Sequence, residues 1–317
     1  MIIKVVVAGL LLLAPGLAPG DPAPQGDSGA RGKGFQHGNT RGVRLQNSKI
    51  IITGTGLSGK SDGYRLKRPC WYEPGRDAAD MLRTQESVRD WWFRFTENPT
   101  EEKYQEFLKQ FRDKIGEEGR WWAPAYNWAD PNGLSCWIGL EPFVWVPPGT
   151  TPPGGITIAE LVEIARAALT VPEPKIELNP DAKSYVNLPT WVWLSGVGET
   201  TRSVTATLPG VMSATVTATL EDIEIDAGTT ADRAEVKEDC GPTGKPYAKG
   251  GEFTCGVRYL RASIDQPRDV YELTVTSVWP IEVEDDVVPF AYDPVEVGVT
   301  RDVPVGEVQS TVRKSGR

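Results

Sequence analysis

Apolar side chains recur three and four positions apart in the first half of the chain, with polar residues between them. That period places the apolar residues on one face of an amphipathic helix. It predicts helices over residues 77–95 and 100–119, and a third helix from Thr157 onward. Thr100 precedes an acidic first turn, and Thr157 forms a capping-box pattern with Glu160, so both threonines should cap a helix.

The period changes to two in the second half of the chain, where Val, Thr, Ile and Tyr alternate with polar residues. Alternation of this kind, with Gly, Pro and Asp between the segments, predicts short strands of an antiparallel sandwich. The segments with this pattern are residues 204–208, 213–225, 256–263, 271–283 and 305–312. We therefore expect an α+β protein, with a small Trp-rich helical domain over residues 64–170 and a β-sandwich domain over residues 171–317.

The first 20 residues have the pattern of a secretion signal. Lys4 precedes an apolar run over residues 5–14, and small residues follow up to Gly20. The run is shorter than the roughly 20 apolar residues that a membrane-spanning helix needs. We expect an exported protein that does not span a membrane. Its mature chain should begin with a flexible basic linker over residues 21–63, which is rich in Gly, Pro, Ser and Arg.

Charge is unevenly distributed along the chain, whose formal net charge is −9. Residues 21–75 hold nine basic and four acidic residues, whereas residues 173–317 hold fourteen basic and twenty-four acidic ones. An acidic body argues against nucleic acid as a partner, because the phosphate backbone attracts positive charge. Two interpretations of the basic leading segment stay open: contact with an anionic wall polymer or lipid surface, and a solvated tail. We favour the tail.

Four cysteines and a single histidine limit the chemistry of the chain. An even number of cysteines in an exported protein is typical of disulfides, and four cysteines allow three pairings. We favour Cys70–Cys136 and Cys240–Cys255, because each pair then stays within one domain. Zinc is disfavoured, since the chain has no C-x-x-C motif and His37 lies in the predicted linker. A lone histidine in a linker also argues against Ser-His-Asp and Cys-His catalysis.

A match to the nucleotide-binding pattern G-x-x-x-x-G-K-[ST] follows the apolar residues 50–52. Its fixed positions are Gly54, Gly59, Lys60 and Ser61. Such a phosphate site needs a helix that starts at the Lys-Ser pair, so that backbone amides point at the phosphates. Here Gly63 and Pro69 interrupt any helix. We therefore expect a coincidental match, in which residues 49–53 form an edge strand and residues 54–61 a flexible joint.

Eight of the eleven tryptophans lie between residues 64 and 170, and several of them surround two carboxylates. Aromatic faces stack on sugar rings, and a glycosidase needs two carboxyl groups roughly 5–9 Å apart. A carbohydrate site would use Asp130 and Glu141 as candidate acids, with the aromatic residues Trp121, Trp122, Trp128 and Trp137. Alternatively, the tryptophans fill a small core and residues 130–133, DPNG, form a turn. We favour the core and the turn.

Three acidic residues alternate with two isoleucines in the segment DIEID. On a strand, Asp222, Glu224 and Asp226 share one face and the isoleucines share the other. Because Ca²⁺ prefers six to eight oxygen ligands, this face is a candidate calcium site. The spacing is not that of a calcium loop, however, and an exposed acidic face discourages pairing between sheet edges. We favour the exposed face, and we expect no metal ion and no cofactor.

The end of the second half carries a family resemblance. Residues 255–259, CGVRY, are followed after a gap by residues 271–279, YELTVTSVW. This order resembles the last two strands of PKD domains, and the resemblance covers residues 200–283. It implies an immunoglobulin-like sandwich of a kind that acts as a spacer or a binding module. With residues 178–194 included, the chain is similar to exported proteins of Gram-positive bacteria, a likeness that implies no activity.

The sequence therefore favours a non-enzymatic exported protein that acts as a binding or adaptor module, at the cell surface or outside the cell. Its expected partner is another exported protein or a cell-wall polymer. A carbohydrate-binding or carbohydrate-active protein is the second expectation. An ATP- or GTP-binding protein is the third and least favoured one.

Overall fold

The computed structural model describes residues 32–37, 40–45, 48–286, 288–289 and 291–308. The predicted secretion signal, residues 1–20, and the first part of the predicted linker lie outside the described residues. Five α-helices occur in the described part of the chain, together with five β-sheets. Pairings between the named strands are antiparallel, apart from that of the two-residue strands β8 (Ser184–Tyr185) and β18 (Val305–Gly306). The α+β class is therefore confirmed.

The three predicted helical segments are all present. The helices are α1 (Ala78–Ser87), α2 (Arg89–Phe95), α3 (Glu101–Arg112), α4 (Gly133–Gly139) and α5 (Ile158–Ala168). Val88 leaves the helical backbone range and divides the first segment into α1 and α2. Both predicted caps are confirmed: the hydroxyl of Thr100 accepts from the backbone of Lys103, and Thr157 forms a complete capping box with Glu160. The seven residues of α4 are too few to show a helical period, so the sequence did not predict it.

A three-stranded sheet lies against the helices α1–α3. It consists of β4 (Cys70–Pro74), β5 (Arg120–Tyr126) and β6 (Val144–Val146), with β5 in the middle. Adjacent residues of a strand point to opposite faces, so the two neighbouring tryptophans of β5 enter different cores. Trp121 packs with Phe111 and Leu108 in the helical cluster, whereas Trp122 belongs to the main core of the protein.

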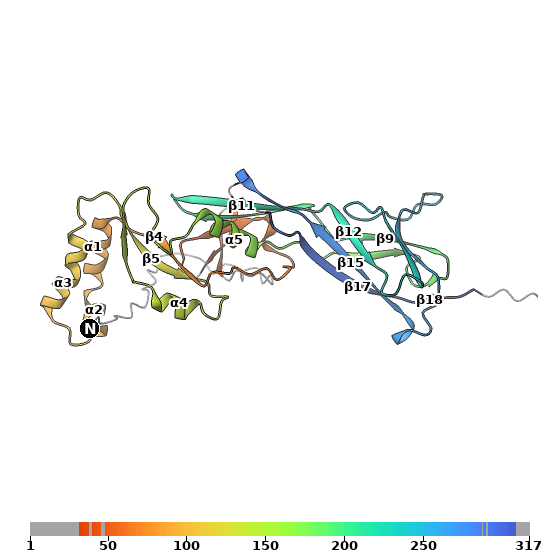
Figure 1. Ribbon diagram of the computed structural model, residues 1–317, viewed down its shortest axis with the longest axis horizontal. Helices are drawn as coiled ribbons and strands as arrows, with labels where there is room; N and C mark the ends of the chain where they lie inside the picture. The colour runs from red at the N-terminus through yellow and green to blue at the C-terminus, as the bar shows by residue number, and fades with distance from the viewer. Residues whose placement is uncertain (1–31, 38–39, 46–47, 287, 290, 309–317) are drawn as a thin grey trace, which may run out of the picture.

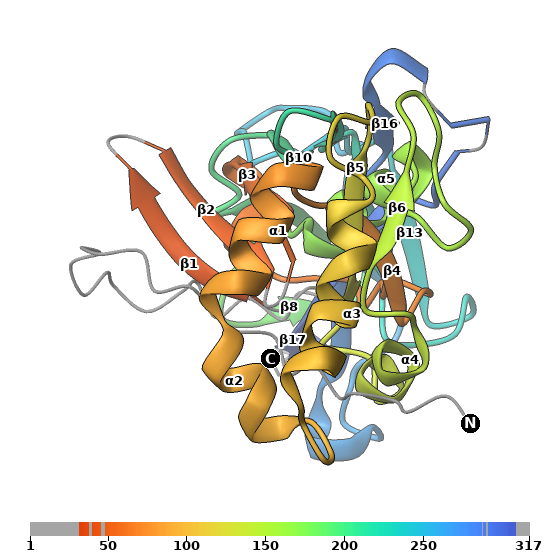
Figure 2. The ribbon, with the colours of Figure 1, turned by 90° about the vertical axis from the view of Figure 1, so that its left-hand side faces the viewer.

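A six-stranded sheet forms the middle of the molecule, in the order β1-β2-β3-β10-β11-β16. Its strands are β1 (Gly32–His37), β2 (Thr40–Leu45), β3 (Ile51–Gly54), β10 (Thr201–Leu208), β11 (Met212–Thr219) and β16 (Ile281–Val283). Helix α5 packs on β10 and β11. Figure 2 shows β1, β2 and β3 side by side along one flank, with β10 next to β3.

The flexible linker predicted over residues 21–63 is therefore wrong where the chain is described. Residues 32–54 contribute three strands, and His37 ends the first of them. The strand β3 is not an edge strand either, because it pairs with β2 on one side and β10 on the other. Ile50 and Ile52 are fully buried in the main core. The partner β10 lies about 150 residues further along the chain, so no local pattern could reveal the pairing.

The main core also crosses the domain boundary that the sequence suggested at residue 170. It joins Ile52 of β3, Trp122 of β5 and Leu161 of α5 to Val204 of β10 and to Trp279, near the end of the second half. The reason is physical: α5 has a strongly apolar face and needs a sheet to cover it, and that sheet is built largely from the second half of the chain. Residues 64–170 therefore share the main core with residues 171–317, in addition to a smaller cluster of their own around the helices α1–α3.

The remaining strands form two facing sheets with a second core between them. One sheet has the order β13-β14-β9-β7 and the other β12-β15-β17. Their strands are β7 (Lys175–Asn179), β9 (Pro189–Ser195), β12 (Asp222–Asp226), β13 (Ala234–Glu238), β14 (Cys255–Tyr259), β15 (Tyr271–Trp279) and β17 (Val295–Val303). Tyr259 and Tyr271 stack in this core at 4.7 Å between ring centroids. Two antiparallel sheets around one core agree with the predicted β-sandwich, but residues 204–208 and 213–219, which the sequence assigned to it, belong to the six-stranded sheet.

The molecule is elongated, and its three cores follow one another along its longest axis (Figure 1). The helices α1–α3 occupy one end, followed by β4 and β5, then α5 with β11, and the sandwich with β9, β12 and β17 occupies the other end. None of the helices in the described part of the chain combines the length and apolar character that crossing a membrane requires.

Both predicted disulfides are present in the structure. Cys70 pairs with Cys136 at a Cα–Cα distance of 5.8 Å and links β4 to α4. Cys240 pairs with Cys255 at a Cα–Cα distance of 4.7 Å, and closes the excursion between β13 and β14. Each bond stays within one region of the fold, which is the reason that the sequence favoured this pairing.

Candidate functional site

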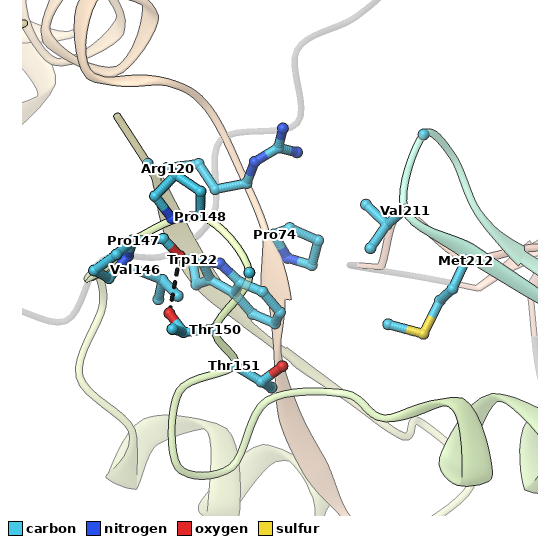
Figure 3. Close-up of a pocket in the computed structure, with 13 residues that line it drawn as sticks. Pro74, Arg120, Trp122, Val146, Pro147, Pro148, Thr150, Thr151, Val211 and Met212 are labelled. Atoms are coloured by element: carbon cyan, nitrogen blue, oxygen red, sulfur yellow. Dashed lines mark hydrogen bonds between the residues drawn. The ribbon is translucent and has the colours of Figure 1, made fainter. Parts of the chain in front are cut away.

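A pocket of about 460 Å³ lies where the three-stranded sheet meets the turn of the β10–β11 hairpin (Figure 3). The sheet forms its floor. The loop after β6 and the hairpin turn form its two walls. Since those parts lie far apart in the sequence, the pocket exists only because α5 and β5 dock on the six-stranded sheet.

The strand register places the residues of the floor. Trp122 on β5 lies opposite Pro74 on β4, and Arg120, two residues earlier on the same face, lies opposite Val146 on β6. Trp122, Pro74 and Val146 are buried, so they present only part of their surface to the pocket. Arg120 is exposed and is the charged residue of the lining.

Two turns form the walls. In the loop after β6, the hydroxyl of Thr150 donates to the carbonyl oxygen of Pro147 at 2.8 Å and closes a turn. Proline fixes its own backbone φ angle, so the neighbouring Pro147 and Pro148 stiffen this wall. On the opposite side the backbone N–H of Val211 donates to Leu208 at 3.0 Å and closes the hairpin. Val211 and Met212 project from that turn toward the floor (Figure 3).

The lining suits binding better than proton transfer. Its side chains are apolar or carry hydroxyl groups, with Arg120 as the single ionisable group. A guanidinium stays protonated at physiological pH, so it can neither accept nor supply a proton as a general acid–base catalyst does. Val211 is 43 % exposed, which leaves an apolar side chain available to a ligand.

A buried carboxylate supports the floor from behind. Glu73, next to Pro74, is only 4 % exposed. Its oxygens accept from the hydroxyl of Ser48 at 2.6 Å, the backbone N–H of Lys49 at 2.7 Å and the indole of Trp71 at 2.8 Å. Burial raises the pKa of this carboxyl above its usual range, although the three donors and the charge of Lys49 oppose the shift. Glu73 thereby fixes the chain entering β3 against β4.

The four tryptophans of the predicted carbohydrate site lie in three different places. Trp121 is buried in the helical cluster, with Phe111 at 4.9 Å between ring centroids, while Trp122 is in the pocket floor. Trp128 and Trp137 flank Tyr126, at 5.2 and 6.1 Å between ring centroids. Trp128 is 47 % exposed, so among these four tryptophans it presents the broadest ring surface to solvent.

The two candidate acids lie outside the pocket lining. The carboxylate of Asp130 accepts from the backbone of Asn132 at 2.7 Å, and its carbonyl oxygen accepts from Gly133 at 3.0 Å. This is the turn that the sequence offered as the alternative, and it leads directly into α4. Glu141 is exposed, and its backbone carbonyl accepts from the hydroxyl of Tyr72 at 3.1 Å.

The segment that matches the nucleotide-binding pattern, residues 54–61, packs closely against the protein's own backbone. After β3 come the 3-10 turn η1 (Thr55–Leu57) and an extended chain, and residues 61–69 contain no helix. A Cβ atom at Gly54 would lie 2.1 Å from the carbonyl oxygen of Ser203, and one at Gly59 would lie 2.3 Å from that of Val171. The backbone of Lys60 pairs with Val171 through two hydrogen bonds. Close packing therefore accounts for the two glycines.

The other fixed positions of the pattern lie nearby. The side chain of Lys60 forms an ion pair with Glu173 at 3.3 Å, with both groups about half exposed. The hydroxyl of Ser61 accepts from the backbone of Gly63 at 3.1 Å. Residues 54–61 thus join β3 to α5 by defined contacts, instead of forming the flexible joint that we expected.

The acidic strand residues are placed as the alternation predicted. Asp222, Glu224 and Asp226 on β12 are exposed, while Ile223 between them is 2 % exposed and belongs to the sandwich core. Asp226 accepts from the backbone of Gly228 at 2.8 Å. Within the described residues, no group of three or more His, Cys, Asp or Glu side chains is arranged to hold a metal ion.

Sequence reasoning missed the pocket. Its apolar residues Val211 and Met212 lie in a hairpin turn, where they interrupt no helical or strand pattern. A signal was present in the turn residues, because Pro-Pro-Gly at residues 147–149 and Pro-Gly at residues 209–210 mark two rigid turns flanked by apolar residues. The sequence around either turn does not indicate that the two turns face each other in the fold.

Comparison with known proteins adds no relative. No protein-family model matches the chain, and no curated protein and no solved structure was found to match it. The function proposed for the pocket therefore depends on the geometry of this chain alone.

Proposed function

We propose that this chain is an exported, non-enzymatic binding or adaptor protein, and that it recognises its partner through the pocket between β5 and the β10–β11 hairpin. The observation that carries the proposal is the pocket itself, about 460 Å³, with apolar walls held by two closed turns. Concave, largely apolar sites with few polar groups are the usual form of ligand sites in proteins.

Export is supported by two independent features. Two disulfides are typical of proteins that fold in an oxidising compartment. The sequence pattern of the first 20 residues is that of a secretion signal. We therefore place the protein at the cell surface or outside the cell, with another exported protein or a cell-wall polymer as its partner.

The sandwich is proposed to act as a spacer. It occupies the end of the molecule opposite to the helices α1–α3 (Figure 1). The pocket lies between the three-stranded sheet and the β10–β11 hairpin of the middle sheet. The resemblance of residues 200–283 to PKD domains supports an immunoglobulin-like module of this kind, in the part from β12 to β15 that belongs to the sandwich. A spacer of this kind holds the pocket away from whatever the far end is attached to.

The test compares two variants of the mature protein as bait in culture medium and cell-wall extract. Met212→Arg places a charge in the apolar wall of the pocket. Ile264→Arg is the matched control, because Ile264 is 80 % exposed in the sandwich half. We expect a partner that binds the wild type and the control and is lost with Met212→Arg. A partner that binds all three proteins equally well would show that the pocket is not the recognition site.

Carbohydrate binding is the second candidate, and one observation favours it. Trp128 exposes 47 % of its surface beside Tyr126 and Trp137, an arrangement that suits stacking on a sugar ring. Titration of tryptophan fluorescence with soluble cell-wall glycans tests it. The signal should respond in the wild type and not in Trp128→Ala, and a flat response in both would exclude the candidate.

A further inference from the structure

Three cationic residues gather at the edge of the pocket where β4 ends. Arg120 lines the pocket directly. The Nζ atom of Lys49 donates to the carbonyl oxygen of Pro74, a lining residue, at 2.9 Å. Arg76 follows Pro74 by two positions, and its carbonyl oxygen accepts from the backbone N–H of Trp121, next to Arg120, at 2.8 Å.

Lys49 lies within electrostatic reach of both arginines. Burial lowers the pKa of Lys49, and the positive charges of Arg76 and Arg120 lower it further, while Glu73 opposes the shift. The single hydrogen bond to Pro74 uses one of the three donors on the ammonium group. The residue as a whole is exposed although its ammonium group is partly desolvated, and no further hydrogen bond of this group occurs among the described residues.

Two carboxylates near the end of β4 are already engaged. Glu73 is buried, and its two oxygens accept three hydrogen bonds. Asp77 accepts from the backbone of Asp80 at 2.8 Å, as the cap of α1. Among the described residues, no carboxylate forms an ion pair with any of the three cations, although fourteen ion pairs occur elsewhere.

This concentration of positive charge is unusual in a chain whose formal net charge is −9. Like charges held close together repel one another, and a bound anion relieves that repulsion. Arginine also offers a planar fork of N–H donors that matches carboxylate and phosphate groups. The wall formed by Val211 and Met212 is apolar, so the pocket offers an apolar surface and a positive charge to the same ligand.

We propose that the pocket binds an amphiphilic organic anion: its carboxylate or phosphate group lies against Arg120, Lys49 and Arg76, and its apolar part lies between Trp122 and the turn that carries Val211 and Met212. The inference rests on the proposed function of the pocket and specifies the class of ligand. In Figure 3 the guanidinium of Arg120 lies above Pro74, beside the opening that Val211 and Met212 face.

The test uses two fluorescent probes of nearly the same shape. One is 8-anilinonaphthalene-1-sulfonate, which carries an anionic group, and the other is N-phenyl-1-naphthylamine, which lacks it. Both are titrated into the mature protein, into Arg120→Gln and into the control Arg94→Gln. Arg94 is an exposed arginine on α2, away from the pocket lining. Met212→Arg reports whether either probe occupies the pocket.

We expect the sulfonate probe to bind about tenfold or more weakly to Arg120→Gln, since a charge-assisted hydrogen bond is lost, and to bind Arg94→Gln like the wild type. The uncharged probe should bind all of these proteins equally. Its affinity should fall only with Met212→Arg. Added salt should weaken the sulfonate probe selectively, because exposed charges are screened.

Different results overturn the two proposals. If Arg120→Gln leaves the sulfonate probe unaffected while Met212→Arg weakens both probes, the pocket binds apolar ligands and the anion site is wrong. If Met212→Arg affects neither probe, the pocket is not a binding site, and the proposed function fails together with this inference. Displacement of the sulfonate probe by decanoate alone assigns a carboxylate ligand, and displacement by decyl phosphate alone assigns a phosphate ligand. Failure of both to displace it contradicts the proposal.

Discussion

Replacing Glu73 tests how the segment before β3 is held against β4. The carboxylate accepts from Ser48, the backbone of Lys49 and Trp71, at 2.6 to 2.8 Å. Glu73→Ala leaves these three donors without an acceptor in a site where the side chain is only 4 % exposed. Each abandoned donor costs roughly 1–3 kcal/mol, and removal of the desolvated charge offsets part of that sum. We expect the free energy of unfolding to fall by about 3 kcal/mol.

The raised pKa of Glu73 predicts whether the stability of the fold increases or decreases with pH. Burial raises the pKa of Glu73 above its ordinary value of 4.5, so between that value and the raised pKa the folded protein binds more protons than the unfolded chain. Stability contributed by the protonated group is therefore present at low pH, and is lost as the pH rises through the folded-state pKa. Glu73→Gln keeps one oxygen acceptor and does not titrate.

The assay is urea unfolding followed by tryptophan fluorescence, in steps from about pH 4 to about pH 8. The free energy of unfolding of the wild type, minus that of Glu73→Gln, should decrease as the pH rises and then become constant. A difference that increases with pH would mean that the folded state stabilises the ionised carboxylate. That result would refute the account of Glu73 as a desolvated group.

Three further substitutions test other contacts. Gly54→Ala should destabilise the fold by about 3 kcal/mol in thermal unfolding, because the backbone φ is +140° and the new Cβ would meet a carbonyl oxygen of β10 at 2.1 Å; an unchanged melting temperature would contradict this. Asp62→Ala should lower the free energy of unfolding in urea by about 3–5 kcal/mol, since it leaves the buried guanidinium of Arg166 without its carboxylate partner. A decrease below about 1 kcal/mol would contradict a buried ion pair. Replacing Cys70 and Cys136 by serine opens a loop with a sequence separation of 66 and should lower the free energy of unfolding by about 4 kcal/mol in calorimetry; an unchanged melting temperature would contradict this.

The parts of the fold that the sequence predicted correctly depend on neighbours in the chain. Thr100 and Thr157 cap helices because the groups they bond lie three residues away. The alternation of β10 and β11 was visible because each strand has one face in the core and one in solvent. Cys240 and Cys255 were paired correctly because the bond closes a local excursion.

The parts that failed depend on contacts between distant segments. Residues 32–54 have the composition of a linker, and they become strands only because β10 offers a free edge. Gly54 and Gly59 match the pattern of a phosphate-binding loop because close packing against another backbone also requires glycine. The pocket and its three cations come from β4, β5, the start of β3 and a distant hairpin turn, so no spacing in the sequence could point to them.

The two neighbouring tryptophans of β5 have a mechanical consequence. Trp121 is fixed among the rings of the helical cluster and Trp122 in the pocket floor, and a single peptide unit connects them. Closely packed cores resist small displacements, so β5 is a rigid connection between the helical cluster and the main core. A displacement of Trp121 by the helices is therefore expected to shift Trp122 and Arg120 in the pocket floor as well.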